Sequence, residues 1–318
     1  MSKVSVAMTT YNGSVFILPQ LQSLSEQTRL PDEVIICDDN SADDTVRIVR
    51  EFIEENALDS WIVCQNEKNL GYIENFRKAM SLTTGDIVFL CDQDDVWQSE
   101  KIATMEAIME ANLDVTALAS GYSHIDRFGN LITEKIRKFY NPPIFCRYLP
   151  TVSRVRHGRI LYANVAQGCT MAYRRSLVDT YCVAKNCTRM PHDWALNMMA
   201  YETRGLFFLN RELLLYRLHG NNTIGVGNKN DAIICRIPRL NDYVDEINDA
   251  QQLPLLDRTK REIRDIVKLT HARIHFLKKK QITVWLAGLM NNFLPFMRFY
   301  ILQYIKDLLL VLLGKIPQ

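Results

Sequence analysis

Short apolar runs alternate with amphipathic segments along the first 120 residues of the chain. The runs are Val4–Met8, Val34–Cys37, Trp61–Cys64, Ile87–Cys91 and Val115–Ser120. Between them, apolar residues recur at the 3.6-residue spacing of a helix. Strands that are apolar throughout, with helices between them, form parallel sheets covered on both faces. The pattern therefore predicts an α/β fold with a mostly parallel, Rossmann-like sheet.

Composition limits the classes of function that fit this chain. Its 318 residues are 47% hydrophobic, which is enough for a substantial core, and the formal net charge of +2 argues against a nucleic-acid partner. The eight cysteines include no C-x-x-C pair. This pattern favours buried thiols in a reducing cytosol over a zinc site.

The chain is expected to have two parts. Residues 1–227 carry the strand and helix pattern, with strands and helices alternating over residues 1–120 and an irregular basic stretch over 135–165 in the second half, 121–227. Residues 228–318 read as a helical C-terminal region. Ser14 and the Ser41–Asp44 pair precede helical patterns and are predicted to cap them.

Polar residues follow three of the predicted strands. They are Thr9–Tyr11 after the first strand, Asp38–Asp39 after the second and Asp92–Asp95 after the fourth. In open α/β sheets, ligands bind beyond the carboxyl ends of the strands. We therefore expect these groups to share one crevice.

The D-x-D pair formed by Asp92 and Asp94 has two interpretations. Neighbouring carboxylates repel each other unless water, protonation or a cation compensates. A hard divalent cation such as Mg²⁺ or Mn²⁺ binds one or two carboxylates together with phosphate oxygens. The alternative is a solvated turn that precedes a helix. Asp38 and Asp39 at a neighbouring strand end favour a site for a metal and a nucleotide.

Several segments, in order, resemble one enzyme family. VSVAMTTYNG, PDEVIICDDNSADDT and TGDIVFLCDQDDVWQSEKI are similar to the inverting glycosyltransferases of family 2, which have the GT-A fold. GCTMAYRRSL, PHDW and YRLHGNN resemble the acceptor-side segments of that family. The resemblance covers roughly residues 3–227. The DQDDVW and YRLHGNN forms are most similar to rhamnosyltransferase-type members.

The resemblance implies a nucleotide-sugar half, 1–120, and an acceptor half, 121–227. Thr9 and Tyr11 would line the nucleotide base and ribose, and Asp39 would accept a hydrogen bond from the pyrimidine ring. Asp38 would belong to the same pocket or brace its turn. Asp92 would contact the ribose or a metal-bound water.

The same resemblance implies a metal and a diphosphate site. Asp94 would be the direct ligand of Mg²⁺ or Mn²⁺, and His219 would complete the metal shell or contact the diphosphate. Arg217 would offset phosphate charge. Asp95 departs from the minimal motif and is kept as a candidate substrate contact.

Asp193 is the candidate catalytic base, because the family places its catalytic acid at the start of this helix. Without the resemblance, an acid there would read as a partner of the helix dipole. His192 is a hydrogen-bonding neighbour, a second base or a polar cap. Trp97 and Trp194 either stack on sugars or pack in the core.

The implied activity is metal-dependent sugar transfer with inversion in cell-envelope polysaccharide synthesis. The donor would be dTDP-L-rhamnose or another dTDP- or UDP-sugar, and the acceptor a glycan or a polyprenyl-linked saccharide. The alternative is a nucleotidyltransferase or another nucleotide-binding α/β protein. Such proteins usually carry a glycine-rich or lysine-bearing phosphate loop after the first strand, whereas TTYNGS has one glycine and no lysine.

The tail contains apolar pieces at Ile282–Met290, Phe293–Ile305 and Leu308–Leu313, with polar residues between them. None reaches the roughly 18 residues of a membrane span. Apolar helices flanked by lysines are typical of segments that lie along an anionic membrane. We therefore expect a cytoplasmic protein that is peripheral on the inner face of the cell membrane. The alternative is packing on the catalytic domain or an oligomer contact.

Overall fold

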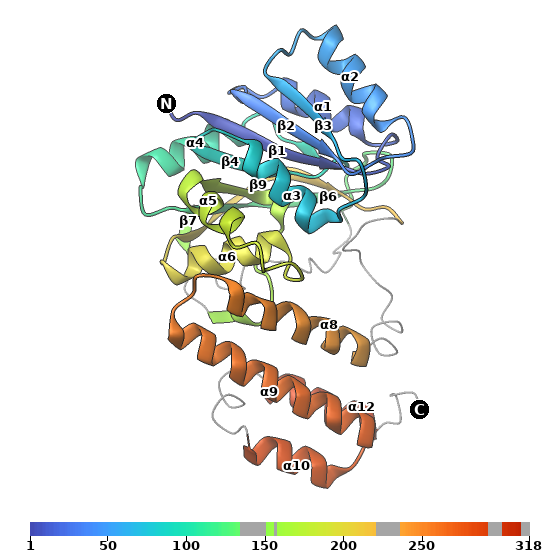
Figure 1. The fold of residues 1–318 in the computed structure, drawn as a ribbon, viewed down its shortest axis with the longest axis vertical. Helices are drawn as coiled ribbons and strands as arrows, with labels where there is room; N and C mark the ends of the chain where they lie inside the picture. The colour runs from blue at the N-terminus through green and yellow to red at the C-terminus, as the bar shows by residue number, and fades with distance from the viewer. Residues whose placement is uncertain (134–150, 156–157, 221–235, 292–300, 313–318) are drawn as a thin grey trace. The chain divides into compact units, whose positions relative to one another are not determined.

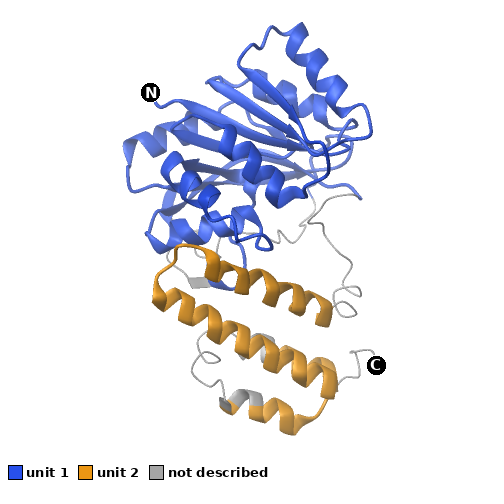
Figure 2. Cartoon of the chain, viewed as in Figure 1, with its two compact units in different colours: residues 1–225 blue, residues 226–318 orange. Residues whose placement is uncertain are grey.

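The computed structural model describes residues 1–133, 151–155, 158–220, 236–291 and 301–312. The chain divides into two compact units, Met1–Gly225 and Val226–Gln318, which Figure 2 draws in blue and orange. The sequence placed this division at residue 227.

The first unit is built on one sheet, which has nine strands within the described residues (Figure 1). Their order is β3 (Trp61–Gln65), β2 (Glu33–Asp38), β1 (Val4–Thr10), β4 (Ile87–Cys91), β8 (Met171–Arg174), β6 (Ala117–Ile125), β9 (Leu206–Arg217) and β5 (Val96–Trp97), and β7 (Val152–Arg154) also pairs with β9. The first four strands in this order pair in parallel with one another, as predicted. Beyond β4 the sheet is mixed, because β8 runs antiparallel to both β4 and β6, whereas β6 and β9 are parallel.

Helices cover both faces of this sheet. One face packs against α1 (Ile17–Ser25), α2 (Thr45–Glu55) and α4 (Lys101–Ala111), and the other against α3 (Tyr72–Leu82), α5 (Arg175–Val183) and α6 (His192–Glu202). All seven residues of β1 are buried. Alternate residues of β1, Val4, Val6 and Met8, join the core formed with the first set of helices. The unbroken apolar strands thus reflect burial on both faces.

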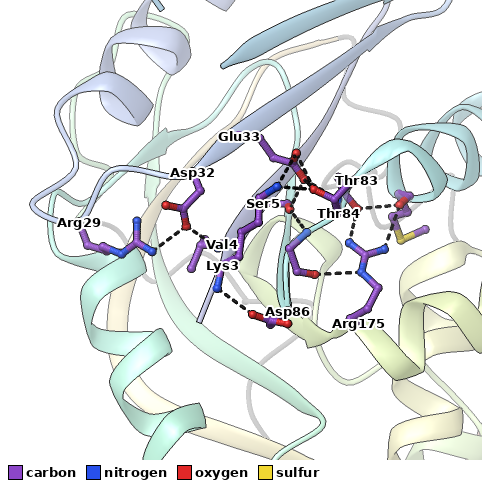
Figure 3. Close-up of polar contacts among 12 residues, drawn as sticks. Lys3, Val4, Ser5, Arg29, Asp32, Glu33, Thr83, Thr84, Asp86 and Arg175 are labelled. Atoms are coloured by element: carbon purple, nitrogen blue, oxygen red, sulfur yellow. Dashed lines mark hydrogen bonds and ion pairs between the residues drawn. The ribbon is translucent and has the colours of Figure 1, made fainter. Parts of the chain in front are cut away.

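The amino ends of the strands are closed by a network of polar contacts, shown in Figure 3. Asp32 accepts hydrogen bonds from the backbone of Val4 at 2.7 Å and from Arg29 at 2.7 Å. Arg175 donates to the carbonyl of Gly85 at 2.9 Å and to Thr83 at 2.6 Å. These groups satisfy one another, and the residues of the predicted site lie at the opposite edge of the sheet.

The predicted helix caps are wrong. Neither Ser14 nor the Ser41–Asp44 pair makes a capping hydrogen bond to a helix. The Ser41 hydroxyl instead donates to Asp38 at the end of β2. Asp43 accepts a hydrogen bond from the backbone of Thr45, the first residue of α2. Ser41 Oγ also accepts from the backbone N–H of Asn12 at 2.8 Å, so a partner 29 residues away in the chain competes with the local cap.

The second unit consists of helices, as predicted for the tail. They are α8 (Arg236–Asp249), α9 (Asp257–Lys279), α10 (Ile282–Asn291) and α12 (Ile301–Leu312), and α9 contacts each of the other three. Phe276, Leu277 and Leu310 form their buried core. Much of the predicted piece Phe293–Ile305 lies outside the described residues. Within the described part of the chain, every helix is too short or too polar to cross a bilayer.

One buried carboxylate ties three of these helices together. Asp307 on α12 is fully buried, and its Oδ1 accepts from Arg236 of α8 at 2.7 Å. Its Oδ2 accepts from Arg273 of α9, also at 2.7 Å. A buried charge of this kind needs its partners, because each lone charge would otherwise lose its hydration without compensation.

We expect Asp307→Ala to lower the free energy of unfolding by about 3–5 kcal/mol, since it leaves the buried Arg273 and the partly buried Arg236 guanidinium groups without a counter-charge. Urea titration followed by the helical circular dichroism signal measures this loss. Asp265→Ala is the matched control, because its Lys268 partner lies 4.0 Å away on an exposed surface and such pairs contribute about 0–1 kcal/mol. Equal stability of the two variants would contradict the role given to Asp307.

Candidate functional site

The loops after β1 and β4 are joined by a pair of hydrogen bonds. The backbone N–H of Tyr11 donates to Gln93 Oε1 at 2.8 Å, and Gln93 Nε2 donates to the Tyr11 carbonyl at 3.0 Å. Thr9 is buried at the end of β1, whereas the Tyr11 side chain is 48% exposed. The sequence reasoning missed Gln93, although its place between Asp92 and Asp94 was a usable signal.

Asp38 braces the turn after β2. Its carboxylate accepts from the Thr10 hydroxyl at 2.8 Å and from the Ser41 backbone at 2.9 Å. The side chain is 1% exposed. Of the two roles considered for Asp38, these contacts favour the structural one.

Asp39 holds a second loop, Asn66–Gly71, close to the strand ends. Its Oδ1 accepts from Asn66 Nδ2 at 2.8 Å and from the Leu70 N–H at 2.7 Å, and its Oδ2 accepts from the Gly71 N–H at 2.9 Å. Gly71 has a φ of 81°, a conformation that glycine adopts without strain. Asp39 therefore shapes the region where a nucleotide base is predicted to bind.

The acidic loop after β4 is fastened to the end of β9. Asp95 Oδ1 accepts from the backbone N–H of Arg217 at 3.0 Å, and Arg217 Nε donates to the Asp94 carbonyl at 2.7 Å. Asp94 Oδ2 lies 2.7 Å from His219 Nε2. The His219 ring in turn stacks on Phe16 at 4.6 Å. The structure thus brings together the predicted residues Asp94, Asp95, Arg217 and His219.

Asp92, Asp95 and Cys169 each offer a ligand atom, and these atoms lie within 4.8 Å of one another. Asp95 Oδ2 is buried and has no hydrogen-bond partner within the described residues. Burial and the charges of Asp95 and Asp92 raise the pKa of the Cys169 thiol well above its usual value, so this group stays neutral. Two carboxylates with an unsatisfied oxygen fit a hard cation such as Mg²⁺ or Mn²⁺.

The carboxylates of this loop are strained electrostatically. Burial, followed by the charges of Asp94 and Asp193, raises the pKa of Asp92 to about 7. Burial and the charges of Asp94 and Asp92 also raise the pKa of Asp95 well above the usual range. The contribution of Asp193 to the Asp92 pKa indicates that the predicted base lies close to the acidic loop. A divalent cation would relieve this repulsion.

Lys101 is a buried neighbour of the acidic loop, and it was not predicted from the sequence as a site residue. The side chain is fully buried, and its Nζ donates to the Cys169 carbonyl at 2.5 Å. The ammonium lies 3.7 Å from the centroid of the Trp97 ring. Burial lowers the pKa of Lys101 to about 8, while the nearby carboxylates Asp95 and Asp92 favour its charged form. A lysine four residues after Trp97, on the apolar face of a helix, was the available signal.

Asp193 is positioned at the start of α6. Its Oδ2 accepts from the backbone N–H of Gly168 at 2.9 Å, and its Oδ1 accepts from that of Trp194 at 2.8 Å. Burial raises the pKa of Asp193 to about 6, despite these hydrogen bonds and one from Asn164. A carboxylate with a pKa near the working pH is suited to accept a proton.

His192 is a buried, neutral imidazole. It stacks on Phe76 of α3 with 4.1 Å between the ring centroids. Burial, with the charge of Arg77, lowers the pKa of His192 to about 3. Both ring nitrogens lack a hydrogen-bond partner within the described residues, so the ring does not cap α6 through a hydrogen bond. The contacts assign His192 a packing role beside Asp193.

The two candidate tryptophans pack in the core. Trp97 is 3% exposed and lies between Phe89 and Lys101. Trp194 is 4% exposed and donates from Nε1 to the Ile160 carbonyl at 2.6 Å. Of the two roles considered for these rings, core packing is the one that the structure supports, because buried faces are closed to a sugar.

Comparison with known proteins identifies relatives whose names describe enzymes that transfer sugars. Over 232 residues the chain is 30% identical to the GalNAc(5)-diNAcBac-PP-undecaprenol beta-1,3-glucosyltransferase of Campylobacter jejuni, covering 73% of this chain and 70% of that protein. It is 26% identical to the dTDP-rhamnosyl transferase RfbG of Shigella flexneri, and the match covers 69% of this chain and 73% of that protein. It is 27% identical to the chondroitin synthase of Escherichia coli over 69% of this chain but only 29% of that protein.

Solved structures share the fold. The TarS fragment 1–349 of S. aureus with UDP-GlcNAc superposes with a TM-score of 0.61 at 19% identity, covering 92% of this chain and 81% of that one. The mannosyltransferase PcManGT of Pyrobaculum calidifontis, with GDP-Man and Mn²⁺, superposes with a TM-score of 0.58 at 16% identity. The match covers 99% of this chain and 87% of that one. The predicted GT-A fold is thereby confirmed.

The family model described as Glycosyl transferase family 2 matches residues 5–182, which contain β1 to β4, the acidic loop and the Gly168–Thr170 turn. This match agrees with the relatives and with the fold, and it leaves no support for the nucleotidyltransferase alternative. The chain belongs to glycosyl transferase family 2 and is a glycosyltransferase.

Proposed function

We propose that this protein transfers a sugar from a nucleoside diphosphate to a hydroxyl group with inversion at the anomeric carbon. The observation that carries the proposal is the turn at Gly168 and Cys169. Gly168 donates its N–H to the candidate base Asp193, and Cys169 lies against the acids Asp92 and Asp95. These contacts support the proposal because one turn joins the candidate proton acceptor to the acids suited to a metal and a diphosphate.

Asp193 is the base in this proposal. The acceptor oxygen forms a bond to the anomeric carbon while the bond from that carbon to the diphosphate oxygen breaks, and the acceptor proton moves to Asp193. Burial keeps the pKa of this carboxylate at about 6, which makes it a stronger base than an exposed aspartate. The hydrogen bond from Gly168 holds one of its oxygens in place.

The acidic loop would hold Mg²⁺ or Mn²⁺ through Asp94, with Asp92 and Asp95 beside it. When bound, such an ion stabilises the negative charge that develops on the departing diphosphate. His219 orients Asp94 through the 2.7 Å contact. Arg217 supports the same loop through its backbone and side chain, so its effect on phosphate is indirect in this proposal.

The proposed donor is a dTDP- or UDP-sugar, with dTDP-L-rhamnose first among them. Thr9, Tyr11 and Asp39 would form the pocket for its base, with Tyr11 exposed and Asp39 fixing the neighbouring loop. The DQDDVW motif and the Shigella relative support rhamnose. The Campylobacter relative, named for an undecaprenol-linked substrate, supports a polyprenyl-linked or glycan acceptor in cell-envelope polysaccharide synthesis. Such an acceptor would place the enzyme at the inner face of the cell membrane.

A panel of donors tests this proposal. dTDP-L-rhamnose, UDP-GlcNAc and GDP-mannose are each incubated with the protein and Mn²⁺ or EDTA, and products are identified by mass spectrometry. We expect turnover of a dTDP- or UDP-sugar that EDTA abolishes, because the charge on the leaving diphosphate then lacks its cation. Turnover of GDP-mannose alone, or full activity in EDTA, would contradict the donor or the metal assignment.

Asp193→Asn should lower kcat by about 10²- to 10⁴-fold, because the amide cannot accept the acceptor proton. The dissociation constant of the nucleotide should stay within about twofold of that of the wild type, since Asp193 lies in the acceptor half. Initial rates and calorimetric titration measure the two quantities. Unchanged turnover would remove Asp193 as the base.

The transfer rate should depend on pH through Asp193. The base acts when deprotonated, and its pKa of about 6 lies above that of an ordinary aspartate. At saturating substrates we expect kcat to fall about tenfold per pH unit below 6 and to level off above it. The residual rate of Asp193→Asn serves as the control and should lose this dependence. A wild-type plateau that extends to pH 4 would exclude a buried carboxyl as the base.

A further inference from the structure

An apolar stripe runs along the exposed side of α10. Ile282, Leu286 and Met290 are 52%, 45% and 77% exposed, and their spacing of four residues puts them on one side of the helix. Val284 and Trp285, on the opposite side, pack against the core of the second unit. The helix therefore has one apolar side that packs, partly buried, against the core and another that is exposed.

A second stripe runs along α12. Ile305, Leu309 and Leu312 are 40%, 51% and 59% exposed, and they follow one another at intervals of four and three residues. Asp307 and Leu310 lie on the other side, in the ion triad and the core respectively. The contacts of Asp307 with Arg236 and Arg273 fix how α12 is rotated against α9, so the stripe on the other side of α12 faces away from the core.

Exposed lysines lie next to both stripes. Lys278 and Lys279 lie at the end of α9, four and three residues before Ile282, the first residue of α10, and Lys306 follows Ile305 on α12. All three are exposed. A positively charged rim around exposed leucine and isoleucine side chains is complementary to an anionic lipid surface, where each lysine adds about fivefold to partitioning.

We propose that these two stripes form a membrane-docking surface that inserts at the interface of an anionic lipid bilayer, with Lys278, Lys279 and Lys306 against the headgroups. The inference rests on the proposed function to the extent that a lipid-linked acceptor would be met there. A second copy of this chain fits the surface less well, because a symmetric contact would bring the same lysines together. In the bilayer, lipid headgroups neutralise them instead.

The test measures co-sedimentation of the full-length protein with vesicles of phosphatidylglycerol and phosphatidylethanolamine, or of phosphatidylcholine alone. Leu286→Ser/Leu309→Ser removes the centre of each stripe. Val183→Ser/Leu113→Ser is its control, with side chains 79% and 78% exposed in the first unit.

Charge is tested in the same assay. Lys278→Gln/Lys279→Gln/Lys306→Gln removes three charges next to the stripes. Its control, Arg261→Gln/Arg264→Gln/Lys268→Gln, removes three charges from an earlier part of α9, beyond a Debye length from the last turn of that helix. The melting temperature of each variant shows whether it is folded.

We expect the wild type to bind the anionic vesicles, and each stripe or lysine variant to lose at least about tenfold in partitioning, with the controls within about twofold. Equal binding by stripe variants and wild type would overturn the proposal. So would equal binding to neutral vesicles, or a dimer in size-exclusion chromatography that Leu286→Ser/Leu309→Ser abolishes while vesicles bind no protein.

Vesicle binding and catalysis can fail separately. Asp193→Asn should bind vesicles like the wild type, and Leu286→Ser/Leu309→Ser should keep its turnover with a soluble acceptor. If the wild type binds vesicles but transfers no sugar, the proposed function fails and the docking surface stands. If it transfers sugar but binds no vesicle, the docking surface fails alone.

Discussion

The hydrogen bond from the Gly168 backbone to Asp193 is the contact on which the rest of the site depends. Gly168 and Cys169 belong to a short turn that leads into β8, between β4 and β6 in the sheet. The turn therefore meets the acidic loop at the end of β4 on one side and the start of α6 on the other. The position of this turn therefore fixes the positions of both the candidate base and the candidate metal site.

The acidic loop is an unfavourable arrangement that the fold maintains. Burial raises the pKa of both Asp92 and Asp95, the charge of Asp94 adds to both shifts, and the charge of Asp92 adds to that of Asp95. The backbone N–H and the side chain of Arg217 at the end of β9 hold this loop in position, and the buried ammonium of Lys101 holds the neighbouring Gly168–Thr170 turn. A divalent cation bound there would relieve this repulsion, as the proposed site for a metal and a diphosphate requires.

Much of the fold of residues 1–120 could be predicted because it depends on local sequence pattern. Strands β1 to β4 are apolar throughout, and the acids that follow them lie at the carboxyl ends of parallel strands, as the α/β rule requires. The order of the motifs along the chain then indicated Asp94, His219 and Asp193 as site residues. In the structure Asp94 contacts His219, and the effect of Asp193 on the Asp92 pKa indicates that these two acids lie close together.

The features that escaped prediction depend on partners far away in the sequence. Val96 and Trp97 form β5 because they pair with β9, more than 110 residues later, and this pairing turns the Trp97 ring into the core. Ser41 Oγ accepts a hydrogen bond from the backbone N–H of Asn12, 29 residues earlier in the chain, rather than capping α2. From the sequence, Lys101 resembles any exposed lysine, because the Cys169 carbonyl that accepts its hydrogen bond lies 68 residues later in the chain. In each case a tertiary contact outweighed the local preference.

The central claim is that the acids after β4 hold a cation against the donor diphosphate. Anomalous diffraction from crystals soaked with Mn²⁺ and dTDP or UDP tests it most directly. The account predicts a manganese peak within about 2.0–2.4 Å of a carboxylate oxygen of Asp94, with diphosphate oxygens on its other side. Nucleotide bound at the strand ends with no manganese in contact with residues 92–95 would contradict it.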